Sequence, residues 1–225
     1  MAPLEITVEG LSSIHRHAER GVISVAVSSD GSSKETVSQE VTSTSNLLQQ
    51  MFKELAPKTE TGTATSDAPI TVFSMGSIQS WSRIQYDKDN QPGPRQYHAS
   101  SSFEVIFRDF EKLGDVASSL FAMPHVDITS ISWRLTDETR ESLGSETRKA
   151  AMLNAIQKAR DYAEVIGREV VAVKITDSGY SAGGRTKQTA RRAVGSGIVA
   201  PPNGLALEPE EVVLSGSVQV QFATE

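Results

Sequence analysis

Cysteine is absent from this chain of 225 residues. Disulfide bonds, thiolate nucleophiles and cysteine-ligated zinc are therefore excluded. Long apolar runs are lacking too, since no stretch of about 18 hydrophobic residues occurs of the kind that a membrane-spanning helix needs. The first residues show no basic segment followed by an apolar core and a small-residue cleavage site, so we expect no secretory signal. These absences together predict a cytoplasmic protein, with the nucleus as a second location, and no membrane span.

Positive charge is also in deficit. The chain has 22 Lys and Arg against 28 Asp and Glu, which gives a formal net charge of −6. Generic binding to a nucleic-acid backbone needs a cationic surface. We therefore do not expect nucleic acid as a partner. The hydrophobic share of 38% is enough for a core, and no composition change marks a boundary, so we predict one domain over residues 1–225.

The first half of the chain alternates between strand and helix patterns. Ile23, Val25 and Val27 have the period of two that is typical of a strand with one buried face. Ser32 and Glu35 then form a capping box, and apolar residues at helical spacing follow as far as Pro57. These signals predict a strand and a long helix.

A hairpin, a helix and a strand are expected next. Residues 70–84 and 97–107 suit two strands joined by a Pro- and Gly-rich turn, with Gly76 as a candidate bulge. Asp109 is placed to cap a short amphipathic helix, and residues 126–135 return as a strand. The order from residue 21 to 135 is therefore β-α-β-β-α-β, which predicts a ferredoxin-like core with two helices on one face of a mostly antiparallel sheet.

The last third of the chain adds a third helix and further strands to this α+β fold. An Ala-rich stripe predicts a helix over residues 146–166, and Gly167 is suited to end it. Strands are expected at 171–175 and 214–222, with Leu4, Ile6 and Val8 as an edge strand. Residues 180–210, which contain Gly, Pro and Arg, predict a flexible loop inserted before the last strand.

The order of these elements resembles the SIMPL (DUF541) family. The residues that carry the resemblance are the amino-terminal Ile6-Thr7-Val8-Glu9-Gly10, the strand from Val126 to Asp137, and the Ala-rich stretch from Arg148 to Ala163. The family offers no established catalytic residues. Its bacterial members are envelope proteins, some of which form ring-like or channel-like oligomers, and its animal member is a cytoplasmic adaptor in innate-immune signalling. The resemblance therefore implies a protein-binding or self-assembling molecule.

Residues that could carry catalysis or bind a metal do not form a recognisable pattern. His15 and His17 would share one face of a strand, as a metal pair can, but the spacing supplies no further ligands, and exposed histidines in a turn are the commoner case. The stretch Ser181-Ala182-Gly183-Gly184 is flexible and is not the strained turn of a nucleophile elbow, and no phosphate-binding loop occurs. We therefore predict no enzyme activity, no cofactor and no metal site.

The aromatic residues of the second hairpin strand have two interpretations. Tyr97, Phe103 and Phe107 share one face, and exposed aromatics on a sheet of this kind can stack RNA bases. The same face is also the one expected to pack under the helices, which is the simpler interpretation.

One basic segment stands out. Its residues are Arg185, Thr186, Lys187, Gln188, Thr189, Ala190, Arg191 and Arg192, and Arg185–Arg191 is identical to a stretch of the amino-terminal tail of one core histone, around a lysine whose methylation is read in chromatin. A chance match in a basic loop is the plain alternative. The histone-tail hypothesis makes Lys187 a candidate for a methyltransferase, or for a methyl-lysine reader acting through cation–π attraction.

The sequence thus predicts an intracellular interaction protein that binds protein partners and forms a homo-oligomer. A signalling adaptor is the leading form of this prediction. A ring-like or channel-like assembly with a structural or stress-protective role is the second, and histone-tail mimicry through residues 185–191 is the third.

Overall fold

The computed structural model describes residues 4–86, 91–183 and 207–224. Over these residues the protein is an α+β structure with three helices and mostly antiparallel sheets, as the sequence predicts. The chain folds into two compact units. We call them the two-helix unit, which is continuous in sequence from β2 to β6, and the one-helix unit, which combines β1 with α3, β7 and β8.

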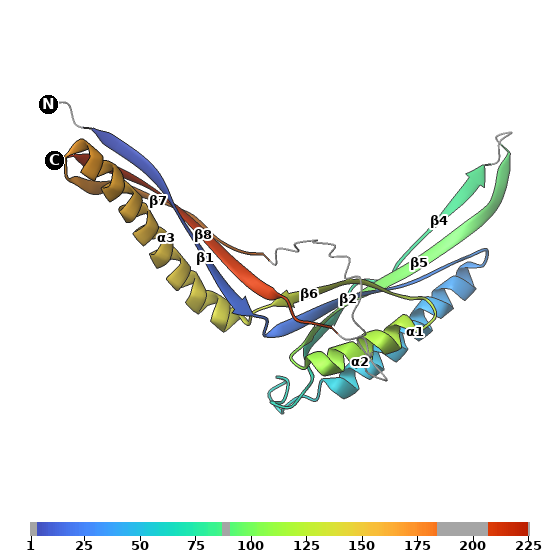
Figure 1. The fold of residues 1–225 in the computed structure, drawn as a ribbon. Coiled ribbons are helices and arrows are strands. Elements are labelled where there is room, and N and C mark those ends of the chain that lie inside the picture. Colours follow the sequence, from blue (N-terminus) through green and yellow to red (C-terminus); the bar gives the residue numbers. More distant parts are fainter. Residues whose placement is uncertain (1–3, 87–90, 184–206, 225) are drawn as a thin grey trace, which may run out of the picture. The chain divides into compact units, whose positions relative to one another are not determined.

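The two-helix unit has a five-stranded sheet under two helices. Its strand order is β3-β5-β2-β6, and β4 pairs with the remaining length of β5. Both helices lie on the same face of this sheet (Figure 1). The elements are β2 (Arg20–Gly31), α1 (Lys34–Leu55), β3 (Ile70–Met75), β4 (Gln79–Tyr86), β5 (Pro92–Phe107), α2 (Phe110–Phe121) and β6 (Val126–Arg134).

The core of this unit follows from the period of two. Ile23, Val25 and Val27 of β2 and Phe103 of β5 are buried on the face that meets the helices. Phe52 of α1 is fully buried, and its ring lies 5.9 Å from the Phe73 ring and 5.7 Å from the Phe103 ring, in tilted and edge-on arrangements that aromatic pairs favour.

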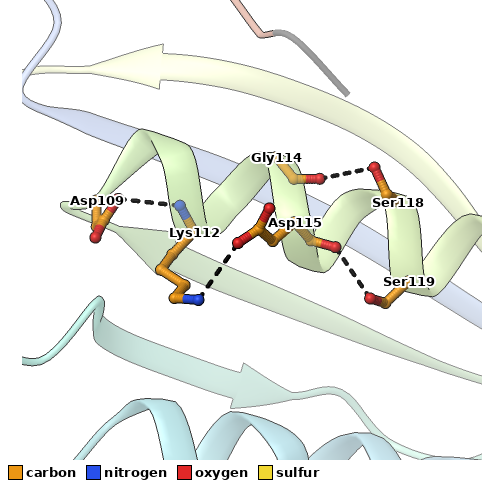
Figure 2. A network of polar contacts seen from close by, with 6 residues as sticks. All are labelled: Asp109, Lys112, Gly114, Asp115, Ser118 and Ser119. Carbon is orange, nitrogen blue, oxygen red and sulfur yellow. Dashed lines mark hydrogen bonds and ion pairs between the residues drawn. The ribbon is translucent and has the colours of Figure 1, made fainter. Parts of the chain in front are cut away.

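Both helices of this unit begin at capped residues. The α1 cap is Ser33, whose hydroxyl accepts a hydrogen bond from the Thr36 backbone N–H, and not Ser32 as the capping-box pattern suggested. Asp109 caps α2 as predicted, because its carboxylate accepts from the Lys112 N–H at 3.0 Å (Figure 2). Figure 2 also shows the Lys112–Asp115 ion pair and the hydroxyls of Ser118 and Ser119, which donate back to carbonyls one turn earlier.

The one-helix unit is a three-stranded sheet with α3 packed on it. The strand order is β1-β8-β7, and every pairing is antiparallel. Figure 1 shows α3 running along this sheet. The elements are β1 (Glu5–His17), α3 (Asp137–Ile166), β7 (Val170–Gly183) and β8 (Glu211–Thr224).

Small residues let α3 approach the sheet closely. The buried stripe of the helix includes Ala151, Ala155, Ala159 and Ala163, one residue per turn. Gly10 of β1 faces this stripe, and a Cβ atom built on it would overlap the Ala151 carbonyl oxygen and lie 2.8 Å from the Ala155 Cβ. The backbone of β1 at Gly10 therefore contacts α3 directly, with no side chain of β1 between them.

The structure differs from the sequence-based prediction at the start of α3. The helix begins at Asp137 and not near residue 146, and Thr136 caps it by accepting from the Thr139 N–H. Gly144 weakened the helical pattern in this stretch, since glycine disfavours helix interiors. It is tolerated because the Tyr180 ring packs against it, 2.8 Å from where a Cβ would stand.

Three further features also differ from the prediction. β1, β7 and β8 form a separate sheet, on which α3 packs, instead of extending the first sheet. His15 and His17 lie in β1 and not in a turn, because β8 pairs with the whole length from Glu5 to His17. β7 continues past Gly179, whose φ of 80° and hydrogen bond to the Asp177 side chain accommodate a bulge, so the first residues of the predicted loop, up to Gly183, are strand. Residues 184–206 lie outside the described residues.

Among the described residues, no helix is both long enough and apolar enough to cross a bilayer.

Replacing Phe52 by alanine removes the side chain that joins α1 to β3 and β5. We expect a loss of about 3–5 kcal/mol in the free energy of unfolding, since the cavity forms in a closely packed core. Urea unfolding followed by circular dichroism measures it. Leu47→Ala on the same helix is the matched control, because Leu47 is 54% exposed and its loss should cost no more than about 0.5 kcal/mol. Equal losses for the two variants would contradict this account of the core.

Gly10→Ala tests the close approach of α3. The added methyl group has no room against Ala151 and Ala155, so we expect destabilisation of about 1–3 kcal/mol from overpacking. Ser13→Ala, an exposed position on the same strand, is the control. A Gly10→Ala protein as stable as the wild type in thermal unfolding would mean that the helix sits farther from the sheet than described.

Candidate interaction site

The hairpin β4–β5 extends past the rest of its sheet. β2 pairs with β5 only from Phe107 back to Tyr97, whereas β4 follows β5 out to Pro92. The residues of β4 from Gln79 to Gln85 are all exposed. In the described part of the chain, β4 pairs with β5 alone, so its outer edge carries backbone groups available to another strand.

An aromatic and polar cluster occupies one face of this hairpin. His98 on β5 lies opposite Trp81 on β4 and opposite Asp30 on β2, so the sheet register brings the three side chains to one face. The His98 Nδ1 is 3.0 Å from the Asp30 Oδ1, and the His98 and Trp81 ring centroids are 4.9 Å apart. The Arg83 guanidinium lies over the Trp81 ring at 5.7 Å.

The chemistry of this cluster follows from its hydrogen bond. A carboxylate can only accept, so Nδ1 of His98 donates its hydrogen to Asp30. The His98 side chain is 20% exposed, whereas Trp81 is 49% exposed. Asp30 and the neighbouring indole, which is tilted by 34° to the imidazole, therefore hold His98 in one orientation, and Trp81 presents a large apolar surface to solvent.

A groove of about 340 Å³ runs between this hairpin and the first turns of α1. It is within the size range of small-ligand sites, yet it is open and largely polar. Lys34 and Arg95 bring positive charge to it, and none of its lining residues is a carboxylate. The lining residues are Lys34, Val37 and Ser38 of α1, Ser80, Trp81 and Ser82 of β4, and Arg95, Tyr97 and His98 of β5.

The structure separates the residues that the sequence singled out. Phe103 and Phe107 are buried under the helices, so the core interpretation of that aromatic face is correct for them. Tyr97 is partly exposed and lines the groove. His15 and His17 are exposed on β1, and the His15 Nδ1 pairs with Glu211 at 3.4 Å. The histone-like segment, residues 185–192, lies outside the described residues.

Sequence reasoning missed the His98 cluster. The turn between the hairpin strands could have indicated that Trp81 lies opposite His98, since hairpin register follows from the turn. Nothing in the sequence relates Asp30 to His98, because they are 68 residues apart and meet only through the pairing of β2 with β5.

A comparison with protein-family models identifies the family of this chain. Residues 6–222 match the model of the SIMPL family, described as a protein of unknown function (DUF541). The search of curated proteins gave no match. The family match spans nearly the whole chain of 225 residues, from β1 to β8, and confirms the resemblance seen in the order of motifs. The chain belongs to the SIMPL family.

Proposed function

We propose that this protein is a non-catalytic interaction protein, and that the hairpin β4–β5 binds an extended, acidic segment of a partner protein. The observation that carries the proposal is the outer edge of β4, where exposed residues run from Gln79 to Gln85 and no described strand pairs. An added strand would satisfy the backbone groups there, which is how many peptide-binding domains gain affinity.

The charges beside this edge favour an acidic segment. Lys34 and Arg95 line the groove on one face of the hairpin, and Arg83 also lies beside Trp81, with its guanidinium over the indole ring. Carboxylates on an added strand would therefore meet cations close to the edge of β4. This local excess of positive charge stands out in a chain whose formal net charge is −6.

Trp81 is the side chain best placed to anchor such a partner. Exposed tryptophan and arginine residues supply much of the binding energy at protein interfaces. His98 packs against the indole and is itself held by Asp30, so the Trp81 ring is ordered before binding, which lowers the entropic cost of association.

Selection of peptides by phage display tests the proposal. We expect the enriched peptides to be rich in Asp, Glu and β-branched residues, and we expect their affinity to fall about tenfold or more with Arg95→Glu and with Trp81→Ala, because each change removes a direct contact. Isothermal titration calorimetry measures the affinity. Lys53→Glu, at the far end of α1, is the control with the same change of charge. Peptides that bind all variants equally would refute the hairpin as the site.

The His98–Asp30 pair favours one other function. The pair has the composition of the base and orienting acid of a hydrolytic triad, and Ser80 and Ser82 line the same groove as His98. These serines pair with Ala99 and Tyr97, so their side chains lie on the opposite face of the sheet from His98. Within the described residues, however, no hydroxyl is hydrogen-bonded to His98. A triad would need a hydroxyl within about 3 Å of the imidazole, so we favour a structural role for the pair.

An esterase assay separates these two roles. If the pair only orders Trp81, hydrolysis of an activated ester such as p-nitrophenyl acetate should be the same for the wild type, His98→Ala and Asp30→Asn. A drop of about a hundredfold or more in both variants, with Trp81→Ala unaffected, would assign general-base catalysis to His98 instead.

The remaining parts of the proposal concern topology and setting. We infer a ferredoxin-like topology for the two-helix unit. Its elements follow the order β-α-β-β-α-β when β3 and β4 count as one interrupted strand, and its strands are arranged β3-β5-β2-β6.

We also propose a cytoplasmic adaptor role, which rests on the family resemblance of the sequence and on the exposed hairpin.

A further inference from the structure

The two edges of the sheet in the one-helix unit differ in how they are protected. At the β1 edge, α3 side chains bond to backbone groups. The Leu11 N–H donates to the Asn154 Oδ1 at 3.0 Å, and the Lys158 Nζ donates to the Glu9 carbonyl at 2.7 Å. Contacts of this kind cover a strand edge and discourage pairing with another strand.

The β7 strand pairs with β8 alone among the described residues, so its outer edge meets no other strand there. Asp177 bonds to the backbone of β7 through the turn at Gly179, within the strand itself. The strand also exposes three β-branched apolar side chains, with Val171 at 44%, Val173 at 55% and Ile175 at 58%. An open edge rich in β-branched residues is a favoured site for an added strand.

A row of apolar side chains crosses the sheet and ends at this edge. Val8 of β1 lies opposite Val220 of β8, which lies opposite Ile175 of β7. Val8 is 7% exposed and Val220 is fully buried, both in the apolar cluster under α3, whereas Ile175 is 58% exposed. The row therefore stops at an uncovered residue, and a further strand carrying an apolar residue at that point would continue it.

The regular part of β7 indicates which strand would fit. Bulges interrupt its pairing between Ala172 and Lys174 and between Asp177 and Tyr180, so the continuous stretch is Lys174–Asp177. If two copies pair antiparallel about a twofold axis that continues the sheet, one residue of this stretch lies opposite its own copy.

The charges of the stretch select one register. Centring the pair on Lys174 or on Asp177 would place like charges opposite each other, which is destabilising. Centring it on Thr176 would place Ile175 opposite Asp177. Centring it on Ile175 places Ile175 opposite its own copy and Lys174 opposite Thr176, and it continues the apolar row into the second molecule.

We propose that β7 is a homodimerisation edge, at which two copies of this chain pair antiparallel about a twofold axis at Ile175. The proposal goes beyond the hairpin function and does not depend on it, since the two surfaces lie in different units. The dimer joins two sheets of the one-helix unit into one continuous sheet.

Cysteine crosslinking tests the register directly, because the chain has no cysteine of its own. Residues directly opposite each other in an antiparallel pair have Cβ atoms about 4.5–5.5 Å apart, close to the separation that a disulfide needs. We expect full-length Ile175→Cys to form a disulfide-linked dimer under mild oxidation, and Lys174→Cys and Thr176→Cys to crosslink at least about tenfold more slowly, since each lies two residues out of register with its own copy. Mixing the last two variants should restore crosslinking.

Molar mass in solution tests the dimer itself. By size-exclusion chromatography with light scattering, we expect the wild type to have twice the chain mass of 24.3 kDa and Ile175→Lys to dimerise about tenfold or more weakly, with an unchanged circular dichroism spectrum. Leu153→Lys, an equally apolar and exposed position on α3, is the matched control and should remain dimeric. A wild type that stays monomeric at its highest soluble concentration, a dimer insensitive to Ile175→Lys, or equal crosslinking at residues 174–176 overturns the proposal. Peptide binding at the hairpin would be unaffected by any of these results.

Discussion

The pairing of the first strand with the last is the interaction on which the one-helix unit depends. β1 and β8 are joined over thirteen consecutive residue pairs, from Glu5 with Ala223 to His17 with Glu211. This ribbon supplies the surface on which α3 packs and the strand along which β7 aligns. The whole of the two-helix unit lies between these strands in sequence, so the pairing closes a very long loop. The entropic cost of such closure grows only slowly with loop length, which makes a long ribbon sufficient to hold the ends.

The packing of α3 on this ribbon explains what it leaves uncovered. The buried stripe of the helix is made mostly of alanine and faces Gly10 and Gly216, so the helix lies close to β1 and β8. A helix with small contact residues covers a narrow width of sheet, and its polar residues Asn154 and Lys158 turn to the β1 edge. β7 is therefore covered only in part, mainly where Tyr180 packs against Gly144. The open edge of β7 is a consequence of the same close packing that stabilises the unit.

The two-helix unit also has an uncovered strand, for a different reason. α1 and α2 bury the centre of the sheet, but β4 and the start of β5 extend beyond the residues that β2 pairs with. In the described part of the chain, the residues of β5 before Tyr97 pair with β4 alone, and the contact of Trp81 with His98 lies at the start of this extension, where Asp30 of β2 still pairs with His98. Both units thus carry a strand whose side chains are exposed and whose outer edge pairs with no other strand among the described residues. The side-chain chemistry of the two strands differs. The hairpin edge is aromatic and cationic, whereas the β7 edge is β-branched and apolar.

The sequence by itself determined the local elements and the family. Periodicity placed the buried residues of β2, β5 and α1, the cap at Asp109 and the end of α3 at Gly167, because these signals arise from neighbours in the chain. It also predicted the antiparallel α+β class. Only the tertiary structure decided the division into two sheets, the full length of β1, the start of α3 ahead of Gly144, and the meeting of His98 with Asp30. Each of these depends on residues far apart in sequence that are brought together by strand pairing or helix packing, and no local pattern reports such contacts. The exposure of β4 and β7 belongs to the same class, since an alternating apolar strand looks alike in sequence whether its edge is paired or open.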